Sequence, residues 1–186
     1  MTNDAAPPCP DGLLAAARGG DHSAFAALVR QHEKSVYSVA WRLMNRADLA
    51  EDIAQDTFLQ LYRHLDRIVS AAHLRFWLLR VATHFSLAQL RRVQPIAVGE
   101  LPEIIDENDG PEASDPALTR KLQAAVATLL PVPRAVMLLR YQEDLDLAEI
   151  ANVLGMPINT VKSHLRRSLN AMRAHLQDAQ LRALHD

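Results

Sequence analysis

Residues 144–173 read DLDLAEIANVLGMPINTVKSHLRRSLNAMR, and this stretch decides the fold of the C-terminal part of the chain. Its first half places apolar residues at the i, i+3, i+4 and i+7 positions of one short helix: Leu147, Ile150, Ala151 and Leu154. Gly155 stands where a helix takes a left-handed C-cap, and Pro157 prevents the helix from continuing. A second apolar stripe follows at Val161, Leu165, Leu169, Met172 and Leu176. The stretch therefore predicts two short helices joined by a Gly-containing turn, which is a helix-turn-helix.

The second of these helices carries a polar and basic outer face. Between Ile158 and Ala174 there are four Lys or Arg residues and no Asp or Glu. The polar set consists of Asn159, Ser163, Arg166 and Asn170, with Lys162, Arg167 and Arg173 beside it. Arg and Asn side chains can hydrogen-bond purine edges bidentately, while Lys, Ser and Thr suit phosphates. We predict that this helix reads DNA; the alternative is the solvated basic face of an ordinary helical hairpin.

The charge of the chain is unevenly distributed along it. The 186 residues carry a net charge of −2, which by itself would argue against a nucleic-acid partner. Residues 95–116, however, contain no basic residue and seven acidic ones: Glu100, Glu103, Asp106, Glu107, Asp109, Glu112 and Asp115. The segments on either side therefore each have a small excess of basic residues, which the total conceals.

Several classes of protein are disfavoured by composition. The single cysteine, Cys9, excludes an internal disulfide or a multi-cysteine metal site, and we predict no cofactor and no bound metal. No apolar run reaches the length of a membrane span or of a signal peptide core, so we expect a cytoplasmic chain without membrane insertion. The eight His residues lack metalloprotease spacing, the six Gly form no phosphate loop, and no Ser/His/Asp set is evident, so we predict no enzyme.

Two amphipathic helices are predicted in the first half of the chain. Helical apolar spacing runs from about Ser23 to Met44, and residues 45–47 interrupt it. Asp48 and Glu51 then have the spacing of a capping box at the start of the next helix. One side of that helix is apolar (Leu49, Ile53, Leu61 and Leu65), and the other is polar (Glu51, Asp52, Gln55, Asp56 and Gln60).

A third helix, over about 73–92, mixes aromatic rings with cations. Leu74, Leu78, Val81 and Phe85 are expected to face inward. The remaining notable side chains are Phe76, Trp77, Arg80, His84, Arg91 and Arg92. Aromatic rings that stack on bases beside Arg groups that meet the backbone suit single-stranded nucleic acid. The alternative is that Phe76 or Trp77 belongs to the core.

The remaining segments complete an all-α prediction. Residues 95–116 read as a linker because Pro and Gly accompany the seven acids, and Asp115-Pro116 can start the next helix. Pro131 and Pro133 are expected to precede a short helix over about 134–141. The fold class is thus two small helical bundles joined by an acidic flexible linker, with the helix-turn-helix in the C-terminal one. The predicted segments are a mobile tail (1–17), a first bundle (18–94), the linker (95–116), a helix-turn-helix bundle (117–178) and a C-terminal tail (179–186).

In order and spacing, these segments resemble the bacterial extracytoplasmic-function sigma factors, a group of the sigma-70 family. The resemblance covers residues 18 to about 177 and is carried by several short stretches. They are ARGGDHSAFAALV near the start, DLAEDIAQDTFLQLYRHL at 48–65, FWLLRVA at 76–82, LRR at 90–92, LLPVPR at 129–134, AEIA at 148–151 and NTVKS at 159–163. The family commonly has Asn where His84 stands and Asp where Ala88 stands, so the promoter sequence is left open.

The resemblance implies a role for three sets of residues. The docking residues Asp52, Gln55 and Asp56 would bind the clamp helices of the beta-prime subunit of core RNA polymerase. The strand-capturing residues, expected to hold the opened minus-ten promoter strand, are Trp77, Arg80, His84, Arg91 and Arg92. The duplex-reading residues, expected to read the minus-thirty-five element, are Arg134, Asn159, Thr160, Lys162, Ser163, Arg166 and Arg167, with Arg134 on a phosphate. An anti-sigma factor is implied as a further partner, and it could hold the chain at the membrane.

Other interpretations remain open from sequence. The acidic side of the second helix could simply keep the domain in solution, and the linker could be a plain solvated tether rather than a segment crossing the basic RNA-exit path of polymerase. A helix-turn-helix regulator that is not a polymerase subunit is the alternative function. Such a regulator would need a sensing or dimerising domain, whereas residues 23–92 offer an acidic face and an aromatic-basic helix.

Overall fold

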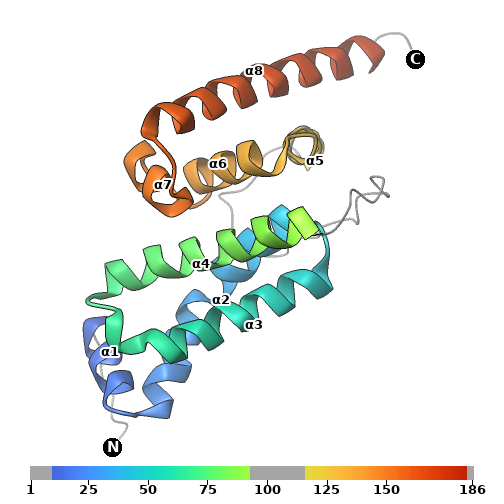
Figure 1. Ribbon diagram of the computed structural model, residues 1–186. Helices are drawn as coiled ribbons and strands as arrows, with labels where there is room; N and C mark the ends of the chain where they lie inside the picture. Colours follow the sequence, from blue (N-terminus) through green and yellow to red (C-terminus); the bar gives the residue numbers. More distant parts are fainter. Residues whose placement is uncertain (1–9, 93–115, 184–186) are drawn as a thin grey trace, which may run out of the picture. The chain divides into compact units, whose positions relative to one another are not determined.

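The structure is a computed structural model that describes residues 10–92 and 116–183, and it describes side chains in 11–92 and 121–177. The described residues form helices and connecting loops with no strand, which agrees with the all-α prediction (Figure 1). The helices are α1 Pro10–Arg18, α2 His22–Met44, α3 Ala47–His64, the 3-10 turn η1 Leu65–Arg67, α4 Ala71–Arg92, α5 Pro116–Ala127, α6 Pro131–Tyr141, α7 Leu147–Leu154 and α8 Ile158–Ala183. They group into two compact units that divide between Gln89 and Leu90.

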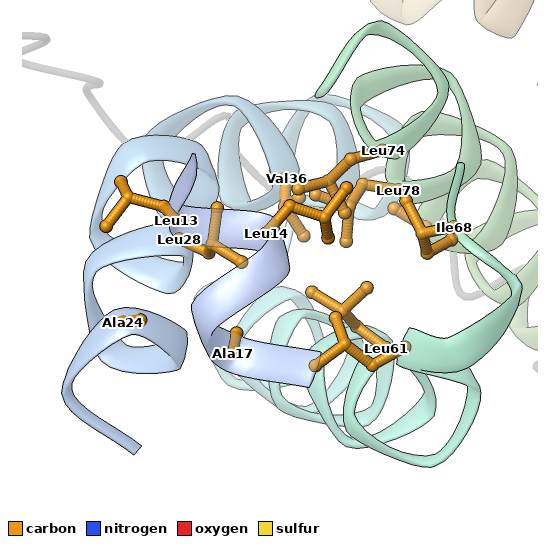
Figure 2. Packing of buried hydrophobic residues seen from close by; sticks show 12 residues of the cluster. Leu13, Leu14, Ala17, Ala24, Leu28, Val36, Leu61, Ile68, Leu74 and Leu78 are labelled. Atoms are coloured by element: carbon orange, nitrogen blue, oxygen red, sulfur yellow. The ribbon is translucent and has the colours of Figure 1, made fainter. Parts of the chain in front are cut away.

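The first unit is built around apolar side chains contributed by α1, α2, α3, η1 and α4. Figure 2 shows this cluster from close by, with side chains from the helices converging on one interior. Its buried members are Leu13, Leu14, Ala17, Ala24, Leu28, Val36, Leu61, Leu65, Ile68, Leu74, Leu78 and Ala82. Burial of this apolar surface is the main force that holds short helices together, because such helices are marginal in isolation.

The N-terminal helix α1 corrects one of the predictions. Residues 1–17 were expected to be a mobile tail, but residues 10–17 are helical and insert Leu14, only 2% exposed, into the core of the first unit. The tight turn that follows uses Gly20 at φ 91°, a value that a residue without a Cβ adopts readily. The prediction failed because nine residues give too short an apolar pattern to distinguish a packed helix from a tail.

The start of α3 differs from the predicted capping box. Asn45 ends α2 in the left-handed conformation, and extended backbone at Arg46 then starts α3 at Ala47. Asp48 therefore lies inside the first turn, where its carboxylate pairs with the Arg46 guanidinium, which holds the pKa of Asp48 below its usual range. The capping-box prediction at Asp48 and Glu51 is wrong. The negative charge of Asp48 in the first turn still stabilises the helix, because it interacts favourably with the positive end of the helix dipole.

The second unit has a core of its own, made by α5 to α8. Buried residues come from every helix of the unit: Ala125, Leu129, Ala135, Val136, Met137, Leu138, Leu139, Leu145, Ile150, Val153 and Val161. Helix α6 begins at Pro131, so the two prolines lie in its first turn rather than before it, where a missing N–H costs nothing. Helix α8 continues to Ala183, so residues 179–183, predicted as part of a C-terminal tail, are helical.

The predicted acidic linker lies outside the described residues except for Pro116, which begins α5. Cys9 lies outside them as well.

Candidate functional site

Local hydrogen bonds satisfy both ends of α7, the helix that precedes the turn to α8. At its start, Asp146 Oδ1 accepts from the Glu149 backbone N–H at 2.8 Å, and Glu149 Oε2 accepts from the Asp146 N–H at 2.6 Å, a complete capping box. At its end, Gly155 adopts φ 64° and ψ 37°, and the Met156 N–H returns to the Ala151 carbonyl at 3.0 Å. The Gly155 prediction is confirmed, and α7 and α8 form a helix-turn-helix with a left-handed glycine at the end of its first helix.

The outer face of α8 gathers most of the duplex-reading residues. Asn159, Lys162, Arg166 and Arg167 are exposed, while Thr160 and Ser163 are half-buried. Val161 is fully buried and fixes the roll of the helix, so the spacing of Asn159, Ser163 and Arg166 places them on the face away from the core. The Ser163 hydroxyl donates to the Asn159 carbonyl at 2.9 Å, and Arg167 Nε donates to the Ser163 carbonyl at 3.2 Å.

His164 lies on the same helix, half-buried beside this face. Burial, and then the positive charge of Arg167, lower the pKa of His164, so the imidazole is neutral near pH 7. The cationic character of the face therefore comes from its Lys and Arg side chains.

Arg134 is placed differently from the other duplex-reading residues. It lies half-buried in the first part of α6, and its Nη2 donates to the carbonyls of Ala127 and Leu129, the latter at 3.0 Å. Burial lowers the pKa of the guanidinium, which still remains a cation. The side chain thus satisfies carbonyls at the C-terminal end of α5. This geometry favours a structural role over the phosphate contact expected from sequence.

The strand-capturing residues follow one line along α4. Trp77, Arg80, His84 and Arg91 are separated by three, four and seven residues, which places them on a common helix face, and Arg92 lies beside it. Arg80, His84, Arg91 and Arg92 are exposed, so four of the five side chains reach solvent.

Trp77 is the exception on this line. Its ring is half-buried, packs against the cluster of the first unit and meets His64 edge-on, with ring centroids 6.4 Å apart. Phe76 is half-buried as well. The sequence left open whether Trp77 packs in the core or offers a stacking surface. The structure shows both: one part of the ring packs against the core, and the other part is accessible.

The docking residues lie on a continuous exposed stripe of α3. Asp52, Gln55 and Asp56 are all exposed on this surface. Sequence reasoning missed Leu59 and Tyr62, which continue the stripe one and two turns later and remain 45% and 53% exposed. The signal was available, because i+3 and i+4 spacing from Gln55 and Asp56 leads to Leu59. Apolar groups beside carboxylates are typical of a protein-binding surface.

Neither a metal centre nor a membrane span is found in the parts of the chain that the structure describes. Within residues 10–92 and 116–183, no group of three or more His, Cys, Asp or Glu side chains is arranged to hold a metal ion. None of the described helices is both long and apolar enough to cross a bilayer.

Comparison with known families matches both units separately. Residues 28–95 match the family model of sigma-70 region 2, and residues 119–172 match that of sigma-70 region 4. A match in both halves favours the sigma-factor prediction over a regulator that carries only the same helix-turn-helix.

Curated relatives agree over most of the chain. The ECF RNA polymerase sigma factor SigL of Mycobacterium tuberculosis is 34% identical over 171 residues, covering 86% of this chain and 94% of that relative. SigE of Mycolicibacterium smegmatis is also 34% identical, over 176 residues, 90% of this chain and 68% of that relative. SigW of Bacillus subtilis is 29% identical over 172 residues, 86% of this chain and 92% of that relative.

Solved structures support the same fold. CnrH, solved in complex with the cytosolic domain of CnrY, superposes with a TM-score of 0.65 at 24% identity, covering 91% of this chain and 97% of CnrH. The sigma factor RpoE of Bartonella quintana, solved with the anti-sigma factor NepR, gives a TM-score of 0.64 at 20% identity, covering 82% and 96%. From the two family models and the relatives at 34% identity, it follows that the chain belongs to the ECF sigma factors of the sigma-70 family, which direct RNA polymerase to promoters.

Proposed function

We propose that the two units of this sigma factor act on promoter DNA in two different states. The second unit reads the minus-thirty-five element as a duplex through the outer face of α8, and the first unit captures the opened minus-ten strand along α4. The observation that carries the proposal is the α8 face, where Asn159, Lys162, Arg166 and Arg167 are exposed directly after a closed helix-turn-helix turn. A helix presented in this way fits the major groove, where Arg and Asn discriminate bases.

The α4 line supports the second half of the proposal. Exposed Arg80, Arg91 and Arg92 can follow a phosphate backbone, while the accessible part of the Trp77 ring and His84 can stack on unpaired bases. A duplex hides its bases from such stacking, so this helix suits a strand that has been separated.

The α3 stripe supports docking on core polymerase. Asp52, Asp56 and Gln55 offer carboxylates and an amide to a basic partner, and the clamp helices of the beta-prime subunit are the partner that we propose. Exposed Leu59 adds an apolar contact within the same stripe.

An anti-sigma factor is proposed as the regulatory partner. RpoE, a protein of the same fold, was solved with the anti-sigma factor NepR, and this chain offers exposed apolar side chains in both units. Since polymerase and promoters are in the bacterial cytoplasm, the proposal places the chain there as well.

The test is transcription by bacterial core polymerase with and without the chain, with the transcripts sequenced and strand opening followed by permanganate reactivity. We expect new transcription start sites when the chain is present, all preceded by the same minus-thirty-five and minus-ten sequences. An unchanged set of start sites would overturn it.

Two variants separate the roles of the units. Arg166→Ala should cost about 1–3 kcal/mol of binding at the promoter and little on random duplex, as expected for a base contact. Equal losses on both duplexes would instead assign Arg166 to a phosphate. Arg80→Ala should reduce opening while duplex binding of the minus-thirty-five element stays unchanged; a loss of duplex binding would contradict the proposed division.

A further inference from the structure

Helix α1 is attached to the start of α4 although about sixty residues of sequence separate them. The backbone N–H of Ala71, the first residue of α4, donates to Asp11 Oδ1 at 2.8 Å. At the other end of α1, Arg18 Nε donates to the Leu65 carbonyl at 3.3 Å, in the turn that leads from α3 toward α4. Side chains at both ends of α1 thus hold the segment that connects the two longer helices.

Apolar packing connects the same elements. Leu13, Leu14 and Ala17 of α1 share the core cluster with Leu74 and Leu78 of α4, and Figure 2 shows Leu14 among the side chains of that cluster. The face of α1 that carries these residues is buried, while Asp11 and Arg18 stay at the surface. Helix α1 therefore shares a core cluster with α4 and holds its first residue by a hydrogen bond.

The turn between η1 and α4 is also held from within. The Val69 N–H donates to His73 Nδ1 at 3.1 Å, and the His73 N–H donates to Ser70 Oγ at 3.1 Å. Ser70 is thus the local cap of α4, and Asp11 is a second acceptor supplied from α1. The terminal N–H groups of α4 therefore have acceptors on two different elements.

We infer that α1 is a positioning element, with Asp11 as the positioning residue that holds the N-terminal end of α4 so that its outer line can receive the promoter strand. The inference rests on the proposed function of α4. Helix α1 lies before the segment that matches sigma-70 region 2, which begins at residue 28. Because the 22 residues of α4 form one continuous helix, the orientation of its first turn is passed on to Trp77, Arg80 and His84.

The experiment compares three full-length variants. Asp11→Ala removes the acceptor from α1, Asp11→Asn keeps an oxygen that can accept the same bond, and Ser70→Ala removes only the local cap of the same helix. For each variant, amide hydrogen exchange over residues 71–78, affinity for core polymerase and permanganate reactivity of the promoter would be measured.

Asp11→Ala should raise exchange at the start of α4 by about fivefold, as loss of a capping contact typically weakens a helix end by this factor, and should also reduce promoter opening. Affinity for core polymerase should stay unchanged, because α3 carries the docking stripe. Asp11→Asn should restore opening, and Ser70→Ala should reduce it less than Asp11→Ala.

Equal losses of promoter opening in Asp11→Ala and Ser70→Ala would overturn the inference. Promoter opening would then depend on capping of α4 in general and not on its contact with α1. Unchanged exchange over 71–78 in Asp11→Ala would overturn it as well. If the unaltered chain opened no promoter with core polymerase, the proposed function would fail, and the exchange measurement would still decide whether α1 holds α4.

Discussion

Arg134 joins the end of α5 to the beginning of α6 through a single guanidinium. Its hydrogen bonds to the carbonyls of Ala127 and Leu129 satisfy backbone acceptors that the end of a helix leaves open. The sequence showed only that Arg134 lies near the start of a helix, and the family resemblance implied a phosphate contact for it. Only the fold brings those carbonyls to the side chain.

Replacing Arg134 by Gln should destabilise the second unit while leaving the salt dependence of promoter binding unchanged. Hydrogen bonds from a charged donor contribute roughly 1.5–3 kcal/mol each, and half-burial of the side chain limits replacement by water. Urea unfolding and binding of minus-thirty-five duplex over a salt series would measure the two effects. Lys121→Gln, which removes an exposed charge from α5, is the control. Full stability with a weaker salt slope would instead show a phosphate contact.

His32 gives the first unit a pH dependence of known sign. It lies half-buried on α2, and burial, followed by the positive charge of Arg75, lowers its pKa. The unfolded chain therefore binds the proton more readily than the folded one, with an ordinary His pKa of about 6.5. Stability present above that value is lost as the pH falls through and below it.

The variant His32→Gln should lose less stability than the unaltered chain when the pH falls from about 7 to about 5, because Gln takes up no proton. Midpoints of thermal unfolding at several pH values, followed by a probe in the first unit, would show this as a flatter curve. Parallel curves for the two proteins would mean that His32 does not contribute.

At the scale of elements, the apolar periodicity of the sequence predicted where most helices lie, but it did not always predict the residue at which a helix begins or ends. The turn at Gly155 was predictable because a left-handed C-cap followed by proline is a local signal. The start of α3 was not predictable in this way, because Asp48 forms an ion pair with Arg46 instead of capping the helix. Asn45, in the left-handed conformation, ends α2 directly before this start.

The α3 stripe gives a prediction for the whole element. Leu59→Ala should weaken binding to core polymerase by more than about 1 kcal/mol if Leu59 is an apolar anchor of the interface. Stability should change little, because the side chain is already 45% exposed. Competition for core polymerase with a reference sigma factor would measure the effect. Val69→Ala, at a side chain 77% exposed in the same unit, is the matched control, and equal affinities for both variants would remove Leu59 from the interface.

At the scale of the molecule, each unit is held by its own core. The apolar cluster that includes Leu14 has members from α1 to α4 and none from α5 to α8. Leu139, fully buried, belongs to the second unit. Two separate cores predict that damage to one unit remains local.

Leu14→Ala should cost about 2–5 kcal/mol in the first unit, through lost burial and a residual cavity. Hydrogen exchange should then rise over residues 11–92 and stay unchanged over 121–177, and Leu139→Ala should show the reverse pattern. Leu130→Ala, at a side chain 74% exposed, should alter neither and serves as the control. Faster exchange in both units after either core substitution would contradict the independence of the two cores.

The sequence by itself determined the helices that follow α1, their exposed polar faces and the helix-turn-helix, because these depend on residues within a few turns of one another. The acidic stripe at Asp52 and the basic face at Arg166 were both visible in this way. The tertiary structure alone decided that α1 joins the core and that Asp11 accepts a hydrogen bond from the first residue of α4. Those contacts form between groups that the fold brings together, and a local pattern of residue types contains no information about which distant backbone group will lie within hydrogen-bonding distance.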